Sequence, residues 1–234
     1  MNPVTPAASS EHNGRRPLAA VAYETIYRKI VTLVYEPGQH LEEGQLVETL
    51  KIGRTPIREA LQRLAADLLV ESQPGKGFVV RPLTVQDTKA AFAALQILES
   101  GVASLAVRQE TAHLLEAMTA ANALVSSAAR QMDILKLVEA NSAFHDAFAR
   151  CSHNVYLIQG LQRVRCETNR LAYLSYANEI EPSRTLKVHY ASVIDQHAQI
   201  IDAIRRRDET RLQEIVMDHI EIFKRRIVNY LAGF

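Results

Sequence analysis

The sequence predicts a mainly α-helical protein, in which a winged helix-turn-helix precedes an antiparallel bundle of six helices. Six of the nine glycines lie at or before Gly77, so short, interrupted segments fill the first third of the chain. Beyond Thr84, apolar residues recur at helical spacing over long stretches with few breakers. We therefore divide the chain into a flexible tail at 1–17, a winged helix-turn-helix at 18–82 and an all-α domain at 83–234.

The composition narrows the class of protein. Hydrophobic residues make up 47% and charged residues 23% of the chain, which excludes a mostly disordered protein. No run approaches the roughly 20 apolar residues of a membrane span, and the N-terminus lacks the pattern of a secretory signal. Two cysteines do not form a disulfide framework. These observations predict a cytoplasmic protein, and a net charge of +1 excludes a strongly basic nucleic-acid coat.

The first part contains short elements with clear boundaries. The predicted elements are helices at 20–34, at 43–50 and from Thr55-Pro56 onward, then strands at 69–73 and 78–81. Ile26, Ile30 and Leu33 form the apolar stripe of the first helix. Thr55 is a good capping residue for the third helix, and proline is tolerated in a first turn. A Gly-rich turn at 74–77 separates the two strands, which is typical of a hairpin.

The second part contains six predicted helices. They span about 84–108, 111–128, 132–151, 155–178, 184–206 and 208–230. Polar or proline breaks separate them at Asp133, Asn154, Pro182-Ser183 and Asp208. Helices of this length with short connections favour an antiparallel bundle, which builds ligand sites from side chains that point inward.

Basic residues gather on the third predicted helix. Arg54, Thr55, Arg58 and Arg63 lie at its start and along its polar side, and Lys76 lies at the hairpin tip. A helix N-terminus accepts phosphate, and arginine reads guanine edges, so this pattern favours DNA binding. Residues 15–82 hold ten Lys and Arg against eight Asp and Glu, so we expect a dimer that reads two half-sites. A solvated arginine face is the alternative.

Three predicted helices of the bundle each carry a histidine among apolar neighbours. Asn141 and His145 share a helix face at i, i+4, and His197 and His219 lie in the middle of later helices. Each alone suits a hydrogen-bonded core histidine. Together they suit a divalent metal, because imidazole nitrogens and an oxygen bind zinc, nickel, iron or manganese.

The stretch from Tyr27 to Pro82 resembles the DNA-binding domain of GntR-family transcription regulators. The matching segments are PGQHL, GRTPIREALQRL and the wing GKGFVV. The resemblance implies that Arg54, Thr55 and Arg58, with Lys76 and Gly77 in the wing, contact operator DNA. Two positions depart from the family: Gly53 stands where serine usually precedes the arginine, and Leu68 replaces a common glycine before the wing, so we expect an altered turn there.

Residues from about Leu83 to Ile227 resemble the FCD ligand-binding domain of the FadR-like branch of that family. The matching segments are NSAFH at 141–145, SHN at 152–154, DQHAQIIDAI around His197 and MDH ending at His219. The resemblance implies that Asn141, His145, His197 and His219 bind a divalent metal, zinc first among zinc, nickel, manganese and iron. It also implies a small carboxylate effector, and six helices are similar to the VanR-like subgroup.

Two departures affect the effector site. Asn141 is neutral where aspartate is commoner, so the protein compensates less of the metal's charge. Leu95 stands where the family's effector-binding arginine is expected, four residues before Glu99. Replacements for that arginine, and residues that shape the pocket, are sought among Arg163, Arg165, Arg170, Tyr173, Tyr176 and His189.

These inferences predict a ligand-responsive transcription regulator, in the usual case a repressor, that acts as a homodimer. Two alternatives stay open. Three histidines around an open metal also suit a metal-dependent hydrolase, although no motif places a general base beside them. A helical domain that serves only dimerisation would make the histidines structural and would show neither metal nor effector response.

Overall fold

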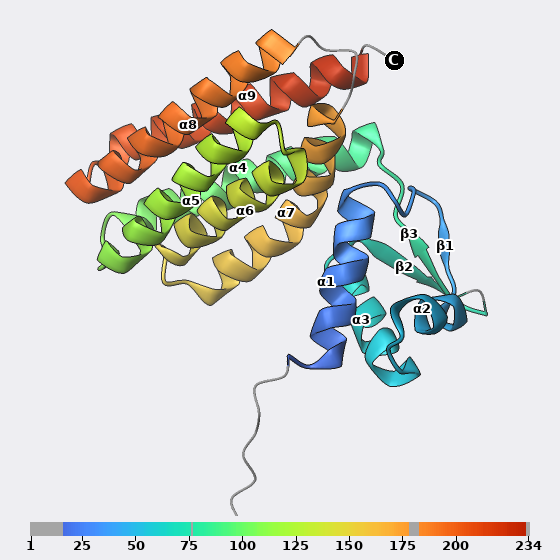
Figure 1. The fold of residues 1–234 in the computed structure, drawn as a ribbon. Helices are drawn as coiled ribbons and strands as arrows, with labels where there is room; N and C mark the ends of the chain where they lie inside the picture. The colour runs from blue at the N-terminus through green and yellow to red at the C-terminus, as the bar shows by residue number, and fades with distance from the viewer. Residues whose placement is uncertain (1–15, 76, 178–182, 233–234) are drawn as a thin grey trace, which may run out of the picture.

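A computed structural model describes residues 16–75, 77–177 and 183–232 of the chain. It divides into a small N-terminal unit and a long helical bundle (Figure 1). The N-terminal unit contains α1 (Leu18–Val31), β1 (His40–Leu41), α2 (Glu43–Leu50), α3 (Arg54–Ala66), β2 (Val70–Gln73) and β3 (Gly77–Val80). The bundle contains α4 (Val85–Ala106), α5 (Ala112–Gln131), α6 (Ile134–Arg150), α7 (Val155–Tyr176), α8 (Ser183–Arg206) and α9 (Glu209–Ala232). This arrangement confirms the predicted fold class. Of the expected tail, only Arg16 and Pro17 lie within the described residues.

Helix α1 packs its apolar stripe against α3. Ile26 and Ile30 are fully buried in one cluster with Ile57, Leu61 and Leu64 of α3. The prediction extended α1 to residue 34 and placed Leu33 on the stripe, which is wrong. The helix ends at Val31 because Leu33 adopts a left-handed conformation with φ 59°, which turns the chain toward β1.

Helix α3 begins one residue earlier than predicted. Gly53, in an extended conformation, is the residue that precedes its first turn, and the N–H of Ile57 donates to the Gly53 carbonyl at 3.3 Å. The expected capping role of Thr55 is therefore wrong, because Thr55 already lies inside the helix. Glycine supplies no side-chain cap here, so the N–H groups at the start of α3 remain available for another acceptor.

The wing is a small antiparallel sheet with the strand order β1-β3-β2. The hairpin pairs Val70 with Val80 and Gln73 with Gly77, as the sequence predicted in outline. Strand β1 was not predicted, because its two residues are too few to show a period. Gly77 adopts φ +81°, a conformation that favours glycine, and a Cβ there would lie 3.5 Å from the Leu41 carbonyl oxygen.

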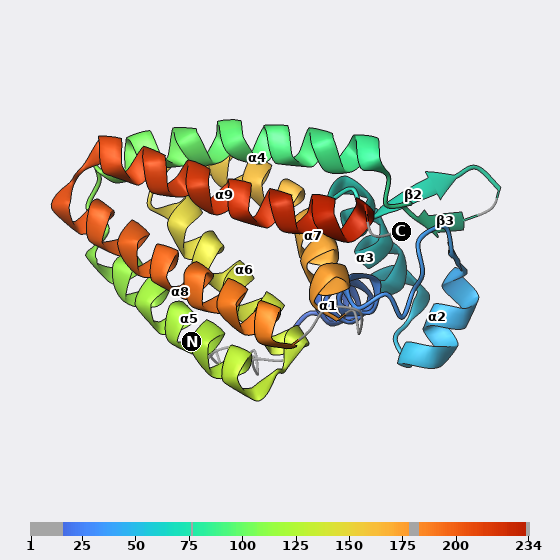
Figure 2. The same cartoon turned by 90° about the horizontal axis from the view of Figure 1, so that it is seen from above.

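The six bundle helices surround a continuous apolar core. Figure 2 shows α8 and α9 side by side along the bundle, with α4 beside α9 and α5 beside α8. Phe92, Val102, Met118, Phe144 and Phe148 are among the buried residues of this core. The predicted breaks hold at two helix starts: Asp133 accepts from the N–H of Lys136, and Asn154 accepts from those of Tyr156 and Leu157.

The two parts of the chain meet along α7. Cys166 of α7 is buried in the apolar cluster of the N-terminal unit, while Val31 of α1 joins a cluster of bundle residues. The Asn169 amide donates to the Tyr27 hydroxyl of α1 at 2.9 Å. Helix α7 therefore belongs to the packing of both units.

The backbone of Leu68 adopts a strained, left-handed conformation that glycine would adopt without strain. It follows the C-terminus of α3 with φ 60°, and its side chain is exposed; this is the form that the expected alteration of the turn takes. We predict that Leu68→Gly is about 1 kcal/mol more stable than Leu68→Ala, because an alanine there keeps the left-handed strain.

The same pair at Leu124, an exposed residue inside α5, serves as the control. There the order reverses, and the glycine variant is less stable by about 1 kcal/mol. Urea unfolding of the four variants measures both differences. If the alanine variant is the more stable of the two at both positions, the assignment of backbone strain to Leu68 is contradicted.

Candidate metal centre and nucleic-acid interface

Three helices bring His145, His197 and His219 together inside the bundle. They come from α6, α8 and α9 respectively, and all three are buried. One ring nitrogen from each lies within 4.8 Å of the others. The ring of Phe144 stacks on that of His197 with centroids 3.6 Å apart, which holds the imidazole in place. The sequence expectation that each histidine faces the interior is confirmed.

Two of the imidazoles are held from behind by amide groups. His197 Nδ1 lies 3.0 Å from Asn122 Oδ1, and His219 Nδ1 lies 2.9 Å from Gln196 Oε1. The Asn122 amide also donates to the Ile194 carbonyl, which fixes its oxygen toward His197. An amide oxygen only accepts, so each Nδ1 carries the proton and each Nε2 presents a lone pair. The sequence reasoning missed both amides; their polarity inside apolar helices was the available signal.

The Nε2 atoms face one another. His145 Nε2 and His219 Nε2 are 3.2 Å apart, and His197 Nε2 is buried without a hydrogen-bond partner among the described residues. Two nitrogens on one tetrahedral zinc would be about 3.3 Å apart, given Zn–N bonds of about 2.0 Å. Burial also lowers the pKa of His145 to about 3 and the pKa values of His197 and His219 well below the ordinary value. Neutral imidazoles with inward lone pairs fit a divalent metal.

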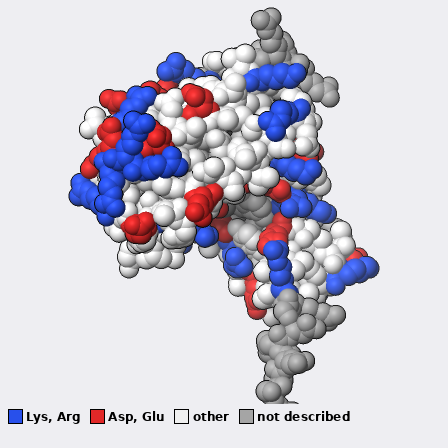
Figure 3. All heavy atoms as spheres, turned by 60° about the vertical axis from the view of Figure 1, so that its left-hand side comes forward, with Lys and Arg blue, Asp and Glu red and all other residues white. Residues whose placement is uncertain are grey.

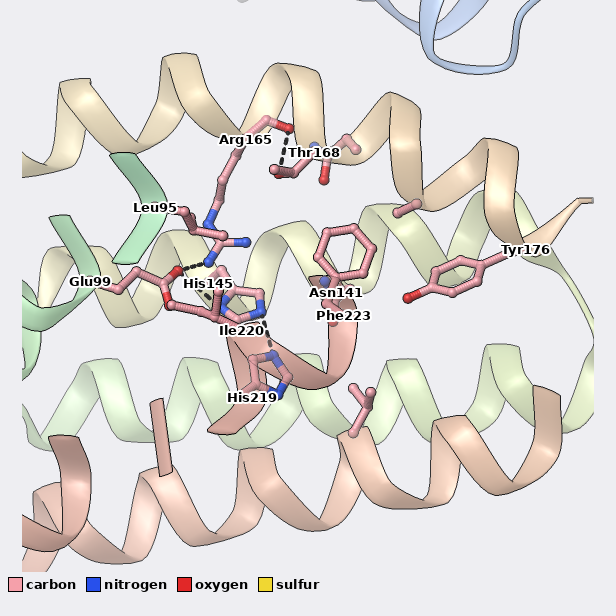
Figure 4. A pocket seen from close by; sticks show the side chains of 13 residues that line it. Leu95, Glu99, Asn141, His145, Arg165, Thr168, Tyr176, His219, Ile220 and Phe223 are labelled. Carbon is pink, nitrogen blue, oxygen red and sulfur yellow. Dashed lines mark hydrogen bonds and ion pairs between the residues drawn. The ribbon is translucent and has the colours of Figure 1, made fainter. Parts of the chain in front are cut away.

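Asn141 lies one turn before His145 on α6 and lines the same cavity as His145 and His219 (Figure 4). The cavity measures about 30 Å³, which is room for about one water molecule. Leu95, Tyr176 and Phe223 form part of its apolar wall. A ligand larger than water therefore needs some of these side chains to move.

Of the three arginines considered for the effector site, the structure brings only Arg165 to the cavity. Its guanidinium forms a buried ion pair with Glu99 of α4, and burial lowers the pKa of Arg165 to about 9, so it stays charged at neutral pH. The pair fills the region beside Leu95 that lacks an arginine. The sequence analysis did not identify Glu99 as a site residue.

The other candidates lie elsewhere. Arg163 is exposed on the outer side of α7. Arg170 is fully buried at the junction of the two units, where it donates to the Arg81 carbonyl at 2.9 Å and pairs with Glu167. Tyr173 packs against an apolar cluster that Val31 of α1 shares with bundle residues, and it does not line the cavity. His189 hydrogen-bonds through Nε2 to the hydroxyl of Tyr176, which itself lines the cavity.

The start of α3 presents Arg54, Thr55 and Arg58 to solvent. Arg58 is oriented by a two-point contact with Glu43 of α2, at 3.0 and 2.8 Å. Gly77 lies at the start of β3, and Lys76 lies outside the described residues. Arg63 is separate from this group: its guanidinium lies over the Tyr23 ring at 4.5 Å, beside the hollow between the two units. Figure 3 shows acidic and basic side chains around that hollow.

A helix with exposed arginines at its N-terminus, joined to a wing, is typical of a DNA-binding unit, and the bundle adds a buried cluster of three histidines. The class is that of transcription regulators. No helix in the described ranges combines the length and apolar character that crossing a membrane requires.

Comparisons with known proteins agree. Residues 18–80 match the family described as bacterial regulatory proteins, gntR family, and residues 90–222 match the FCD domain. The chain is similar to the repressor RspR of Escherichia coli, with 21% identity over 89% of this chain and 88% of that protein. It is also similar to the E. coli repressor GlaR, with 25% identity over 85% and 90%.

Solved structures show the same fold. E. coli McbR/YncC superposes with a TM-score of 0.75 at 19% identity, over 88% of this chain and 95% of that one. A GntR regulator from Rhodococcus sp. RHA1 gives 0.69 at 19% identity, over 90% and 97%. This chain belongs to the GntR family of transcription regulators, in the branch with an FCD domain. It is a regulator and not an enzyme, which removes the hydrolase alternative.

Arg170 has a structural role that can be measured. We predict that Arg170→Met lowers the free energy of unfolding by about 3 kcal/mol, because it leaves the Glu167 carboxylate and the Arg81 carbonyl without their buried donor. Arg163→Met, on the exposed side of the same helix, should change stability by less than about 0.5 kcal/mol. Urea unfolding measures both, and equal effects would refute this role.

Proposed function

We propose that this protein is a repressor whose helical domain binds a divalent metal together with a small carboxylate effector. The observation that carries the proposal is the convergence of ring nitrogens from three buried histidines, two of them on imidazoles fixed by amide oxygens. His145, His197 and His219 would hold the metal, and Asn141 would supply an oxygen from the turn of α6 that precedes His145. Zinc suits this donor set, and nickel, manganese or iron are the alternatives.

The charge of the site favours an anionic effector. A bound metal would supply a positive charge that attracts a carboxylate. The protein side adds the guanidinium of Arg165, which lines the same cavity from α7, and the neutral Asn141 leaves more of the metal's charge uncompensated. The Arg165 side chain is therefore our candidate for the carboxylate contact that Leu95 cannot provide.

Helix α7 is the proposed route from effector to DNA. Asn169 lines the cavity and also donates to the Tyr27 hydroxyl of α1, and one residue further Arg170 holds the Arg81 carbonyl before α4. Because the cavity is small, an effector that enters it displaces its walls, including α7. A displaced α7 shifts the equilibrium between orientations of the winged unit.

The repressor role follows the named role of the relatives RspR and GlaR. We also propose that the protein acts as a homodimer on operator DNA in the cytoplasm. The modest charge of one winged unit favours two half-sites. Ile97 of α4 is 74% exposed and Tyr156 of α7 is 82% exposed. Apolar surface on these neighbouring helices suits a partner subunit.

The metal proposal predicts the composition of the purified protein. Untagged protein should contain about one metal ion per chain, and His145→Ala, His197→Ala and His219→Ala should each reduce it strongly, because each removes a ligand. His113→Ala, an exposed histidine of α5, is the control. Mass spectrometry of the metals measures the content. Unchanged content in the three variants would exclude this site and favour a dimerisation-only bundle.

The DNA proposal predicts that substitutions in α3 weaken the affinity for operator DNA. A duplex selected by the full-length protein from random-sequence DNA serves as the probe. Arg58→Ala should weaken binding by about 5- to 150-fold, since a two-point arginine contact with a base contributes about 1–3 kcal/mol. Arg130 is an exposed residue of α5, and Arg130→Ala should leave the affinity for this duplex unchanged. Equal affinities of wild-type and Arg58→Ala would exclude α3 as the reading helix.

A further inference from the structure

One nitrogen of the histidine cluster differs from its counterparts. Nδ1 of His197 and of His219 each meet an amide oxygen. Nδ1 of His145 is buried and has no hydrogen-bond partner among the described residues. When a histidine binds a metal through one nitrogen, the other N–H almost always donates to a carboxylate, carbonyl or water. His145 therefore lacks the acceptor that its role as a ligand requires.

The nearest carboxylate is that of Glu99. Its Oε1 lies 3.7 Å from His145 Nδ1, beyond hydrogen-bond length by less than 1 Å. Glu99 is 1% exposed, so it cannot turn to solvent. The same oxygen is in the ion pair with Arg165. Figure 4 shows the Glu99 carboxylate beside the Arg165 guanidinium and the His145 ring, with a dashed line to each.

We propose that Glu99 is a positioning residue that the metal centre and Arg165 share. With the histidines holding a metal, its carboxylate accepts from His145 Nδ1; otherwise it pairs with Arg165. This inference rests on the proposed metal site and adds its regulation. A carboxylate drawn toward His145 frees guanidinium donors of Arg165, which then face the cavity. Metal and carboxylate effector would thus bind cooperatively.

The test measures the affinity of full-length, metal-free protein for Zn²⁺ by competition with a chromophoric chelator. The main variant is Glu99→Gln combined with Arg165→Gln, which replaces a buried ion pair by two amides and leaves the net charge unchanged. We expect Zn²⁺ affinity to fall by about 10- to 100-fold, the usual effect of losing such an outer partner. The matched control is Glu167→Gln with Arg170→Gln, a second buried pair on α7, which should leave Zn²⁺ affinity unchanged.

The single variants separate positioning from simple charge. Glu99→Gln should weaken Zn²⁺ binding, and Arg165→Gln should tighten it, because a carboxylate without its arginine turns to His145. In a Glu99→Gln background, the change at Arg165 should have no further effect. Persistent tightening there would show that Arg165 acts only by repelling the cation, and would overturn the inference.

The outcomes also distinguish this inference from the function on which it rests. If wild-type protein binds no Zn²⁺, the metal centre itself fails. If wild-type binds Zn²⁺ and both double variants bind it equally well, the metal centre stands and the shared role of Glu99 is refuted. Thermal melting of each variant confirms that it is folded before titration, and the charge-neutral double variant decides the question if either single variant does not fold.

Discussion

Polar groups buried inside the helical bundle need hydrogen-bond or ion-pair partners within the protein, and the arrangement of the site follows from that constraint. A buried imidazole or guanidinium without a partner costs a large part of the stability of a domain. Accordingly His197 and His219 have amide acceptors, Arg165 has Glu99, and Arg170 has Glu167 and a carbonyl. Nε2 of His197 and Nδ1 of His145 are among the buried atoms without a hydrogen-bond partner in the described residues, as are Nε of Arg165 and of Arg170 and one carboxylate oxygen of Glu167. The two histidine atoms lie in the cluster that we propose as the metal centre.

The same constraint explains why α7 connects the two halves. On one side of α7, Arg165 lines the cavity. On the side that faces the winged unit, Cys166 is buried in the core of that unit. Asn169 contacts both sides, since it lines the cavity and holds Tyr27. The apolar core of the winged unit therefore includes a residue of this bundle helix.

The fold was largely predictable from the sequence, because helix length and apolar period depend on local patterns. The metal candidates followed too, since three histidines among apolar neighbours must point inward. What the sequence could not supply is pairing across the bundle. Nothing in the spacing of Glu99 and Arg165, or of Asn122 and His197, reveals contact, and three arginines on one helix looked equivalent until packing separated them. Local backbone conformation was not predictable either: Gly53 rather than Thr55 precedes the first residue of α3, and α1 ends at Val31, before the left-handed Leu33.

The unusual residues of this chain become consistent when they are considered together. Leu95 removes an arginine from α4, and Arg165 provides one from α7. Asn141 removes a negative charge from the metal centre, and Glu99 keeps one 3.7 Å from His145. Each loss on one helix is matched by a group on another helix that faces the same cavity. In this chain the arginine and the carboxylate of the cavity wall are partners of each other. On the proposed function, an effector carboxylate would compete with Glu99 for Arg165 in the metal-free protein, and a bound metal would relieve that competition by drawing Glu99 toward His145.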